Sequence, residues 1–563
     1  MHHQNLTAAG IKRQPLILDS VLRKKPVWEA DEESHISDLR RVLSVRDLTF
    51  FGIAAIIGGG TFSAIGNACY SGGPAVIFLY IMCGIACGFT AMCYAEFASR
   101  VPVSGSAYTY AYVSFGEIFA WIIGWALLME YSIGNIYVAF SWSGYFTNLV
   151  PGIPEWLTIN YKAAHAAFMA GTPGEGLTAW NSAPQIGGLR IILDMPALVI
   201  NTLITILVFV GTRESRNLSN TMVFIKLAII ALVIGVGVFH IDIENWKPFM
   251  PNGFGGVMAG VSAVFFAYIG FDAVSTLAEE TRKPQRDLPR AMIYSLVICT
   301  IIYIAIALVI TGMASYKLLG VTDPLAEIFK LKGMKWMLFI VSIAAVVAMT
   351  SVLLVFQMGQ PRIWMSMSRD GLLPAKFSSI HPKHKTPGFA TIVTGLVVGI
   401  PILFTDEKLV LDFTSIGTLF AFILVCGGIL LLPADKGLNT KGKFRIPYIN
   451  SKWLVPAGTL ISFLVIGIYY PDSIYLDDAG ERLNFPLIIF YFFWAFMAVL
   501  AFIKKLSFIP LAGLLSCCYL LTGMGWTNWL MFGVWLIIGL TIYFLYGYRK
   551  SKLTGNIAIA EKG

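Results

Sequence analysis

The sequence has few charged residues for its length. Only 13% of its 563 residues are Asp, Glu, Lys or Arg, which is about half the share in an ordinary soluble domain. Apolar residues make up 57%, and the mean hydropathy is +0.72. So little charge cannot cover a water-soluble particle of this size. The composition therefore excludes a soluble enzyme and indicates an all-α polytopic membrane protein.

Motifs for chemistry are also missing. We find no HExxH, GxSxG or Walker A pattern, so we expect neither an enzyme nor a cofactor. The eight cysteines lie in or beside apolar runs without metal-ligand spacing, and we interpret them as packing residues. No pore-lining charge repeats along the chain, which argues against a channel. The net charge of +9 fits basic cytoplasmic loops better than a nucleic-acid partner.

Fourteen apolar segments have a length suited to crossing a bilayer. They begin near Leu48, Ala75, Ile118, Ile191, Ser219, Gly255, Leu288, Trp336, Gly388, Leu409, Trp453, Phe485, Leu506 and Asn528. An even number places both termini on one side, and that side carries 31 of the 41 Lys and Arg residues, against 9 on the other side. This asymmetry predicts cytoplasmic termini.

The spans divide the chain into four parts. We expect a cytoplasmic N-terminal segment at 1–46, a transporter core at 47–433, four further helices at 453–548 and a cytoplasmic tail at 549–563. Residues 36–47 have the pattern of an amphipathic helix on the membrane surface, with an ordinary solvated helix as the alternative. The loop from about 150 to 190 lies outside, with a short helix over Tyr161–Met169. The compact termini, with no sorting signal, favour the inner membrane of a bacterial cell.

Two of the predicted spans contain residues that break a helix in mid-membrane. The first contains Gly58, Gly59 and Gly60, which together cost roughly 3 kcal/mol of helix propensity relative to alanine. The sixth contains Gly270 and Asp272 at its centre. A broken helix exposes N–H groups that attract a carboxylate and carbonyls that attract an ammonium group. Close helix packing is the alternative, but two breaks five spans apart favour a binding site within an inverted repeat.

Ionisable residues inside spans are costly in lipid and usually functional. Lys226 could carry a proton in the interior, or its amine could reach the membrane surface along its flexible stem. Glu130 could contact a substrate side chain, carry a proton or pair with a neighbouring helix. Asp272 is expected to line a polar interior. Glu279 and Glu280 end the sixth span, where a gate or a loop ion pair is as plausible as a role in transport.

Three long stretches carry a resemblance to a known family. GIAAIIGGGTF and the following SGGPAVIFLYIMCGIACGFTAMCYAEFASRVPVSGSAYTY resemble the start of permeases of the amino acid–polyamine–organocation (APC) superfamily. FFAYIGFDAVSTLAEETRKPQRDLPRAMIYSL and MTSVLLVFQMGQPRIWMSMSRDGLLPAKF are similar to its cationic amino acid transporter family. The resemblance runs from about Asp47 to Pro433 and continues more weakly beyond.

The resemblance implies a LeuT-like fold of two inverted five-helix repeats plus four further helices, with the site between spans one, three, six and eight. The substrate carboxylate would meet the N–H groups of Gly59, Gly60 and Thr61. The substrate ammonium would meet backbone carbonyls near the two helix breaks, at Ile56 and Ile57 in the first span and at Phe265, Ala267 and Tyr268 in the sixth. Lys226 resembles a lysine that replaces the sodium ion of related transporters, which implies proton coupling.

Two departures from the family pattern affect the expected substrate. The first break ends in GGGTF, so the Thr61 hydroxyl could alter the carboxylate site. Met349 stands where cationic-selective members have a smaller residue, which favours small or neutral amino acids. Glu130 argues mildly the other way, because a carboxylate would suit a cationic side chain.

Together these features predict a transporter that imports amino acids with protons by alternating access. Its partners would be the amino acid, the proton and the lipid bilayer, without nucleic acid; whether a small membrane subunit joins it stays open. The alternatives are an obligate amino acid exchanger and an amino acid sensor on a transporter scaffold.

Overall fold

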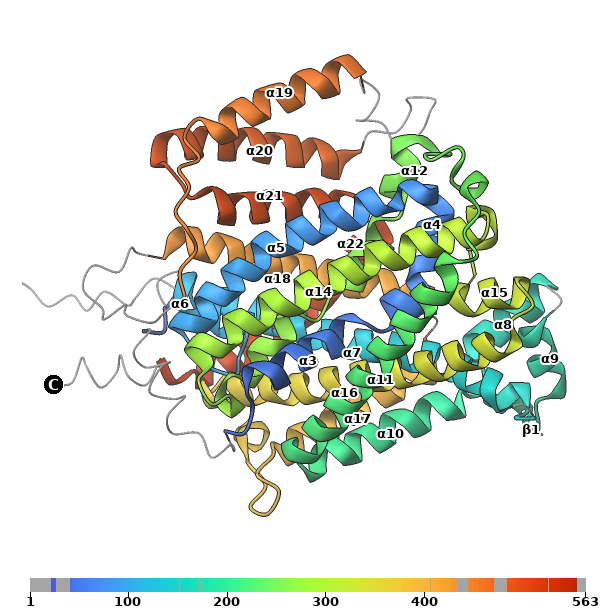
Figure 1. Ribbon diagram of the computed structural model, residues 1–563. Helices are drawn as coiled ribbons and strands as arrows, with labels where there is room; N and C mark the ends of the chain where they lie inside the picture. Colours follow the sequence, from blue (N-terminus) through green and yellow to red (C-terminus); the bar gives the residue numbers. More distant parts are fainter. Residues whose placement is uncertain are drawn as a thin grey trace, which may run out of the picture.

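The computed structural model describes residues 22–26, 41–150, 152–171, 174–321, 323–405, 407–432, 444–469, 484–524 and 526–553. These residues are almost entirely helical, and one two-stranded turn, β1 (Gln185–Ile186) with β2 (Leu189–Arg190), is the exception among them. The main helices are α3 (Val45–Ile56), α4 (Ile65–Gly72), α5 (Val76–Arg100), α6 (Ala107–Ser114), α7 (Glu117–Leu149), α10 (Met195–Val210), α11 (Thr212–Val238), α12 (Gly253–Ala259), α13 (Val261–Tyr268), α14 (Pro284–Met313), α16 (Lys335–Arg369), α17 (Gly388–Ile402) and α18 (Glu407–Leu431). They run side by side as one bundle (Figure 1).

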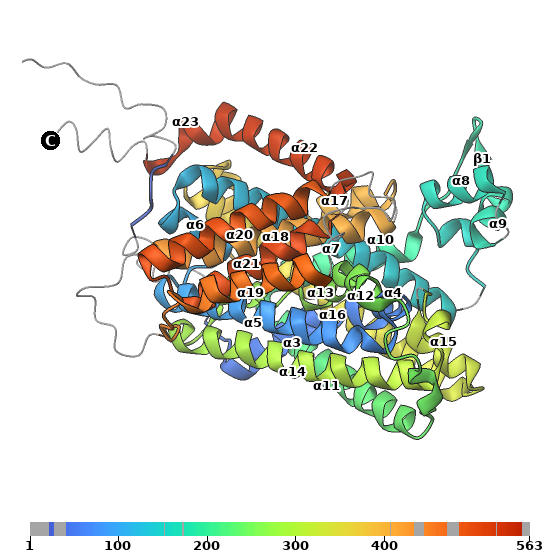
Figure 2. The same ribbon diagram turned by 90° about the horizontal axis from the view of Figure 1, so that it is seen from above.

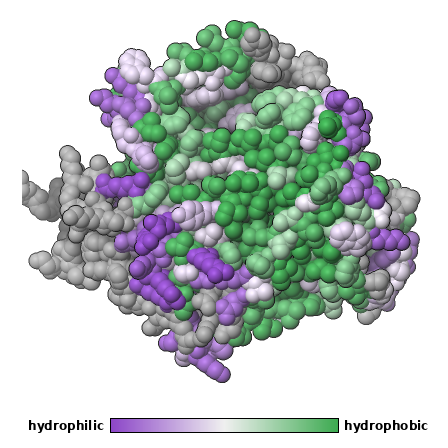
Figure 3. Space-filling model, in the orientation of Figure 1, coloured by the Kyte–Doolittle hydropathy of each residue, from purple (hydrophilic) through white to green (hydrophobic). Residues whose placement is uncertain are grey.

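The bundle has the surface of a membrane protein. Eight of the described helical stretches are long and apolar enough to cross a bilayer, or nine if the bent pair formed by α12 and α13 with its continuation is one span. An apolar face covers the middle of the helices, and hydrophilic residues gather toward their ends (Figure 3). The described residues therefore form a polytopic helical membrane protein.

Each of the fourteen predicted spans coincides with a helix or a broken helix. Four of them, α10, α17, α19 (Leu454–Tyr469) and α21 (Phe508–Thr522), have only 15 or 16 residues. At 1.5 Å per residue such helices reach about 24 Å, which is short of a hydrocarbon core of about 30 Å. The total of fourteen crossings therefore stays a prediction.

Both predicted helix breaks are present. Helix α3 ends at Ile56, and a π-helical turn, η1 (Gly60–Ala64), leads into α4. In the sixth span, α13 ends at Tyr268, and a 3-10 helix, η5 (Asp272–Glu280), continues after Gly270. Helix α3 packs against η5, and η1 packs against α13, so the two broken spans run antiparallel. An inverted repeat would produce this arrangement.

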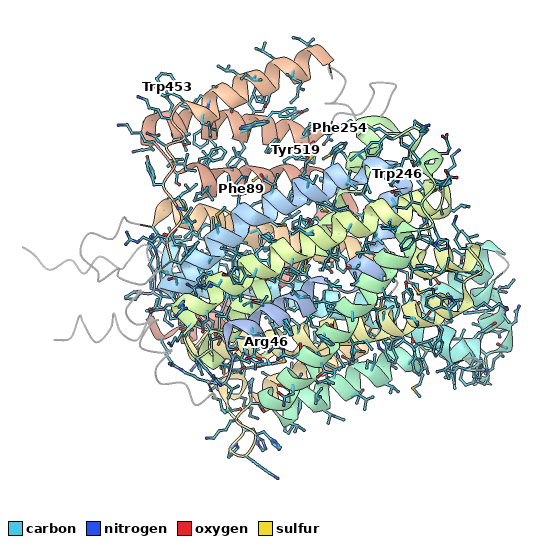
Figure 4. The ribbon with its side chains drawn as sticks, viewed as in Figure 1. Arg46, Phe89, Trp246, Phe254, Trp453 and Tyr519 are labelled. Carbon is cyan, nitrogen blue, oxygen red and sulfur yellow. The ribbon has the colours of Figure 1, made fainter. Side chains whose placement is uncertain are left out.

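The last helices extend the bundle on one side. Phe89 of α5 contacts Phe508 of α21 edge-on, with ring centroids 6.0 Å apart. Tyr519 of α21, labelled in Figure 4, contacts Phe490 of α20 (Phe485–Lys504), and their ring centroids are 5.5 Å apart. Helix α19 packs on α20, and α22 (Trp526–Ile542) packs on α18 and α7. Aromatic contacts thus join the additional helices to the core.

The loop between α7 and α10 forms a small lobe of its own. It contains α8 (Tyr161–Ala170), which confirms the predicted short helix, and α9 (Glu175–Ser182). Trp180 packs there among Ala164, Ala179, Ala183 and Ile192. The lobe projects from the bundle (Figure 2).

The N-terminal segment differs from the predicted surface helix. Residues 36–40 lie outside the described residues, and α3 begins only at Val45. Leu43 pairs with Thr281 in a β-bridge, and its N–H donates to the Glu280 carbonyl at 3.0 Å. The prediction of a helix over 36–47 is therefore wrong for residues 41–44, because the backbone there bonds to the end of η5 instead.

Candidate functional site

The two helix breaks lie directly against each other in the centre of the bundle. A Cβ atom on Gly60 would fall on the backbone of Ala267, and one on Gly270 would fall on Ala55. Gly270 also has a φ of +117°, which a residue with a side chain rarely adopts. The glycines therefore serve two purposes here, since they end the helices and allow close backbone contact.

Lys226 of α11 is buried among the carbonyls that the first break exposes. Its Nζ donates to the carbonyl oxygens of Ile53 and Ala54 at 3.1 Å and of Ile57 at 2.7 Å. It also lies 3.0 Å from Ser351 Oγ of α16. The side chain is 0% exposed, so the alternative in which the amine reaches the membrane surface is wrong. Lys226 instead connects α11, α3 and α16 at the break.

Tyr303 of α14 joins the two breaks. Its hydroxyl lies 2.7 Å from the carbonyl oxygen of Ile56 and 2.7 Å from that of Ala267. One hydroxyl has one proton, so it donates to one of these carbonyls at a time. Two of the carbonyls expected to hold a substrate ammonium are thus within reach of a side chain of the protein itself, and a third, at Ile57, is bonded to Lys226.

The N–H groups expected to hold the substrate carboxylate, those of Gly59, Gly60 and Thr61, lie at the beginning of the η1 turn. The Thr61 N–H donates to the Gly58 carbonyl at 2.9 Å, so the turn itself already uses one of them. The Thr61 hydroxyl is fully buried and lies near the Tyr303 hydroxyl, but among the described residues it has no partner in good hydrogen-bond geometry. A buried hydroxyl without a partner costs free energy, which makes Thr61 a candidate ligand contact.

Helices α7 and α16 lie against the breaks. Tyr137 of α7 lies against Gly59 and packs edge-on against Phe266 of α13, with ring centroids 4.9 Å apart. Val352 of α16 fills the space beside Gly58. Met349 is one turn earlier on the same helix and is fully buried. Spans one, three, six and eight therefore do meet around the breaks.

The remaining expected residues lie in different directions. The Tyr268 hydroxyl donates to the Tyr80 carbonyl at 2.8 Å, away from the first break, and the Phe265 ring packs edge-on against Phe422 of α18, with centroids 6.0 Å apart. Glu130 faces α18 near Gly417 and Thr418. Asp272 begins η5, and its Oδ2 lies 3.4 Å from the Tyr131 hydroxyl.

Ion pairs fix the far end of η5 to α16. Glu280 pairs with Arg362, and both side chains are almost completely buried. Glu279 pairs with Arg369 at 2.9 Å, and its N–H donates to Ser104 Oγ at 3.3 Å. The ion-pair interpretation of these two glutamates is confirmed. They hold the second half of the sixth span against α16.

Sequence reasoning missed Tyr303, Ser351, Tyr137 and Arg362. The first three sit in uninterrupted apolar runs, where a lone hydroxyl gives no signal. Arg362 lies within α16, where Glu280 neutralises its buried charge. The described part of the chain contains no group of three or more His, Cys, Asp or Glu side chains that could hold a metal ion.

Comparison with known proteins gives the chain its relatives. A family model described as amino acid permease matches residues 43–497, and one described as the C-terminus of the permease matches 506–551. The chain is 35% identical to the branched-chain amino acid permease BcaP of Bacillus subtilis, over 95% of the chain and 99% of that protein. It is 35% identical to the methylthioribose transporter of the same organism, over 95% and 100%. It is 30% identical to human cationic amino acid transporter 4, over 94% and 90%.

Proposed function

The chain belongs to the amino acid permease family of the APC superfamily, is not an enzyme, and resembles the cationic amino acid transporters. From this premise we propose that it is a secondary transporter that imports amino acids together with protons by alternating access. The observation that carries the proposal is the buried Lys226 amine, bonded to three carbonyls of the first helix break. An amine in that position can link its protonation to the shape of the break.

The substrate would bind where the two breaks meet. Its carboxylate would meet the start of η1 at Gly59, Gly60 and Thr61, close to the partnerless Thr61 hydroxyl. Its ammonium group would join the Tyr303 hydroxyl at the Ile56 and Ala267 carbonyls, since each carbonyl oxygen can accept two hydrogen bonds. The backbone at Phe265 and Tyr268 would lie nearby. The positive charge of an ammonium suits carbonyls at the end of a half-helix.

We propose small or neutral side chains as the substrate class. Met349 is fully buried and lies one helical turn before Val352, the residue beside Gly58, and its thioether would occupy space that a long side chain needs. The relatives include a branched-chain permease, a methylthioribose transporter and cationic transporters, so substrate choice varies at this level of similarity.

The proposed setting is the cell inner membrane, with both termini in the cytoplasm and fourteen crossings built on the LeuT-like repeat. The described ends of the chain support a common side, because Arg23 and Ser551 both bond to Glu117. The basic loops counted from the sequence favour the cytoplasm for that side.

Uptake of labelled amino acids into proteoliposomes tests the proposal, with and without an inward proton gradient. We expect accumulation that follows the gradient. Accumulation that instead requires amino acid loaded inside would identify an obligate exchanger. Binding without flux under either condition would identify a sensor.

A further inference from the structure

A groove lies between the last three helices, away from the two helix breaks. It has a volume of about 580 Å³ and is lined by the first halves of α20 and α22 and the second half of α21. Along α22 it extends from Trp526 to Ile537, and along α20 from Phe485 to Phe493. The groove therefore occupies the end of the bundle opposite Glu117, which bonds to the residues that follow α22.

The walls of the groove are apolar, and its mouth is not. The described residues that line it include no charged side chain. Thr522 supplies the one hydroxyl among them, which already donates to the Tyr519 carbonyl at 2.7 Å. Trp526 stands at the mouth with 77% of its surface exposed, and tryptophan favours the level where hydrocarbon meets water. The groove thus suits a molecule that is apolar along its length and polar at one end.

The length of the groove matches one leaflet of a bilayer. Ile537 follows Trp526 by eleven residues, so the groove reaches about 16 Å along α22 at 1.5 Å per residue. Half of the hydrocarbon core is about 15 Å thick. A transmembrane helix of a partner would need a groove that continues through the other leaflet, but this groove ends at Phe493 while α20 continues to Lys504. The acyl chain of a lipid stays within one leaflet.

The packing of the helices leaves this space open. Helix α20 packs on α19 and α21, whereas α22 packs on α18 and α7. Gly533 of α22 widens the groove further, because a Cβ atom there would have no neighbour within 4 Å among the described residues. Unfilled space deprives the surrounding side chains of packing contacts. The groove opens sideways from the bundle, so inside a bilayer a lipid can enter and restore those contacts.

We propose that the groove is a phospholipid-binding site, with one acyl chain between α20, α21 and α22 and the head group beside Trp526. The bound lipid supports the seat of α22 on α7. Trp535, next to Val534 in the wall of the groove, stacks on Trp125 of α7 with ring centroids 4.7 Å apart. Each indole N–H also donates to the other residue's carbonyl, at 2.9 and 3.1 Å. Helix α7 in turn places Tyr137 against the first break.

Native mass spectrometry of the purified full-length protein tests the site, with dioleoyl phosphatidylethanolamine as the probe. Gly533→Phe should fill the groove without a clash, because its Cβ has free space. We expect the wild type to retain one lipid after detergent washing and Gly533→Phe to lose it. Gly458→Phe is the matched control, since its Cβ is equally free but lies on α19, outside the groove. Equal lipid retention by Gly533→Phe and the wild type would overturn the proposal.

Thermal unfolding in detergent gives a second measurement, because a ligand that binds only the folded protein raises its melting temperature. We expect the oleoyl lipid to raise the melting temperature of the wild type and of Gly458→Phe, but not that of Gly533→Phe, whose groove is already filled. The same lipid with hexanoyl chains is too short for the groove and should have little effect. Equal rises for the wild type and Gly533→Phe, or for the two lipids, would contradict the site.

A second copy of this chain is the other candidate occupant, and light scattering of the purified protein distinguishes it. We expect the wild type and Gly533→Phe to have the same mass. A wild-type dimer that Gly533→Phe converts to monomers would identify a subunit interface and overturn the lipid site. None of these measurements involves transport, so the lipid site can fail while proton symport holds, and the reverse.

Discussion

Gly60 in the first span and Ala267 in the sixth touch through their backbones, and no Cβ atom fits between them. The Gly60→Ala variant should therefore push the two breaks apart and abolish uptake in proteoliposomes. Gly88→Ala on α5 is the matched control, because its Cβ would make only an ordinary contact with Leu296. Normal uptake by Gly60→Ala would contradict a site at the meeting of the breaks.

Lys226→Met should remove uptake driven by a proton gradient. The methionine cannot bond to the carbonyls of Ile53, Ala54 and Ile57, and each buried group left unsatisfied costs about 1–3 kcal/mol. The melting temperature should therefore fall as well. Ser351→Ala is the milder control, since it removes one of the four contacts of the amine and leaves the amine itself. Gradient-driven accumulation by Lys226→Met at the wild-type level would exclude Lys226 as the proton carrier.

Tyr303→Phe should weaken substrate binding without unfolding the protein. The hydroxyl fixes the Ile56 and Ala267 carbonyls in one arrangement, and loss of one hydrogen bond of about 1.4 kcal/mol corresponds to about a tenfold change in affinity. The measurement is the KM of uptake for a neutral amino acid. Tyr80→Phe serves as the control, because the Tyr80 hydroxyl has no partner among the described residues. Equal KM values for both variants would show that the bridge does not order the site.

Met349→Ser should admit longer side chains. The buried thioether lies one turn from Val352, which contacts Gly58 of the first break. We expect labelled arginine uptake to rise several-fold. Met337→Ser removes the same side-chain volume near the start of α16, away from the breaks, and should leave arginine uptake unchanged. Failure of Met349→Ser to gain arginine uptake would count against the steric argument.

Glu280→Gln should destabilise the protein strongly. Arg362 would lose its partner while still buried, and breaking a buried pair typically costs about 3–5 kcal/mol. Glu327→Gln is the control, because the pair of Glu327 with Lys330 is exposed and such pairs contribute about 0–1 kcal/mol. Thermal unfolding in detergent measures both. Equal melting temperatures would mean that the Glu280–Arg362 pair does not hold η5 in place.

The sequence predicts the helix breaks well and their surroundings poorly. Gly58, Gly59 and Gly60 reveal a break because helix propensity depends on local residues. The hydroxyl of Tyr303 reaches that break from a helix more than two hundred residues later, and no local pattern encodes such a contact. Lys226 left two interpretations open for the same reason. Its stem is long enough to reach either the surface or the interior, and only the packing of α3 and α16 decides between them.

Short-range patterns also fail where another segment competes for the backbone. The apolar and polar residues of 36–47 are spaced as in an amphipathic surface helix. The backbone of Leu43 nevertheless bonds to the end of η5. The family resemblance predicts a site between spans one, three, six and eight, and these spans do meet around the two helix breaks. It did not indicate that Tyr303 and Lys226 already contact three of the expected ligand carbonyls.

The hydrogen bonds to Glu117 join segments of the chain that are synthesised far apart in time. Glu117 accepts hydrogen bonds from Tyr112 and Arg23, which precede it, and from Tyr543 and Ser551, which the ribosome adds more than four hundred residues later. During synthesis the carboxylate at the start of α7 can therefore accept only the first two of these four hydrogen bonds until the last helical turn of the chain has been added. A chain that ends before Tyr543 lacks two of the four hydrogen bonds that this buried carboxylate accepts from these side chains, so the fold around the start of α7 is complete only when the whole chain is present.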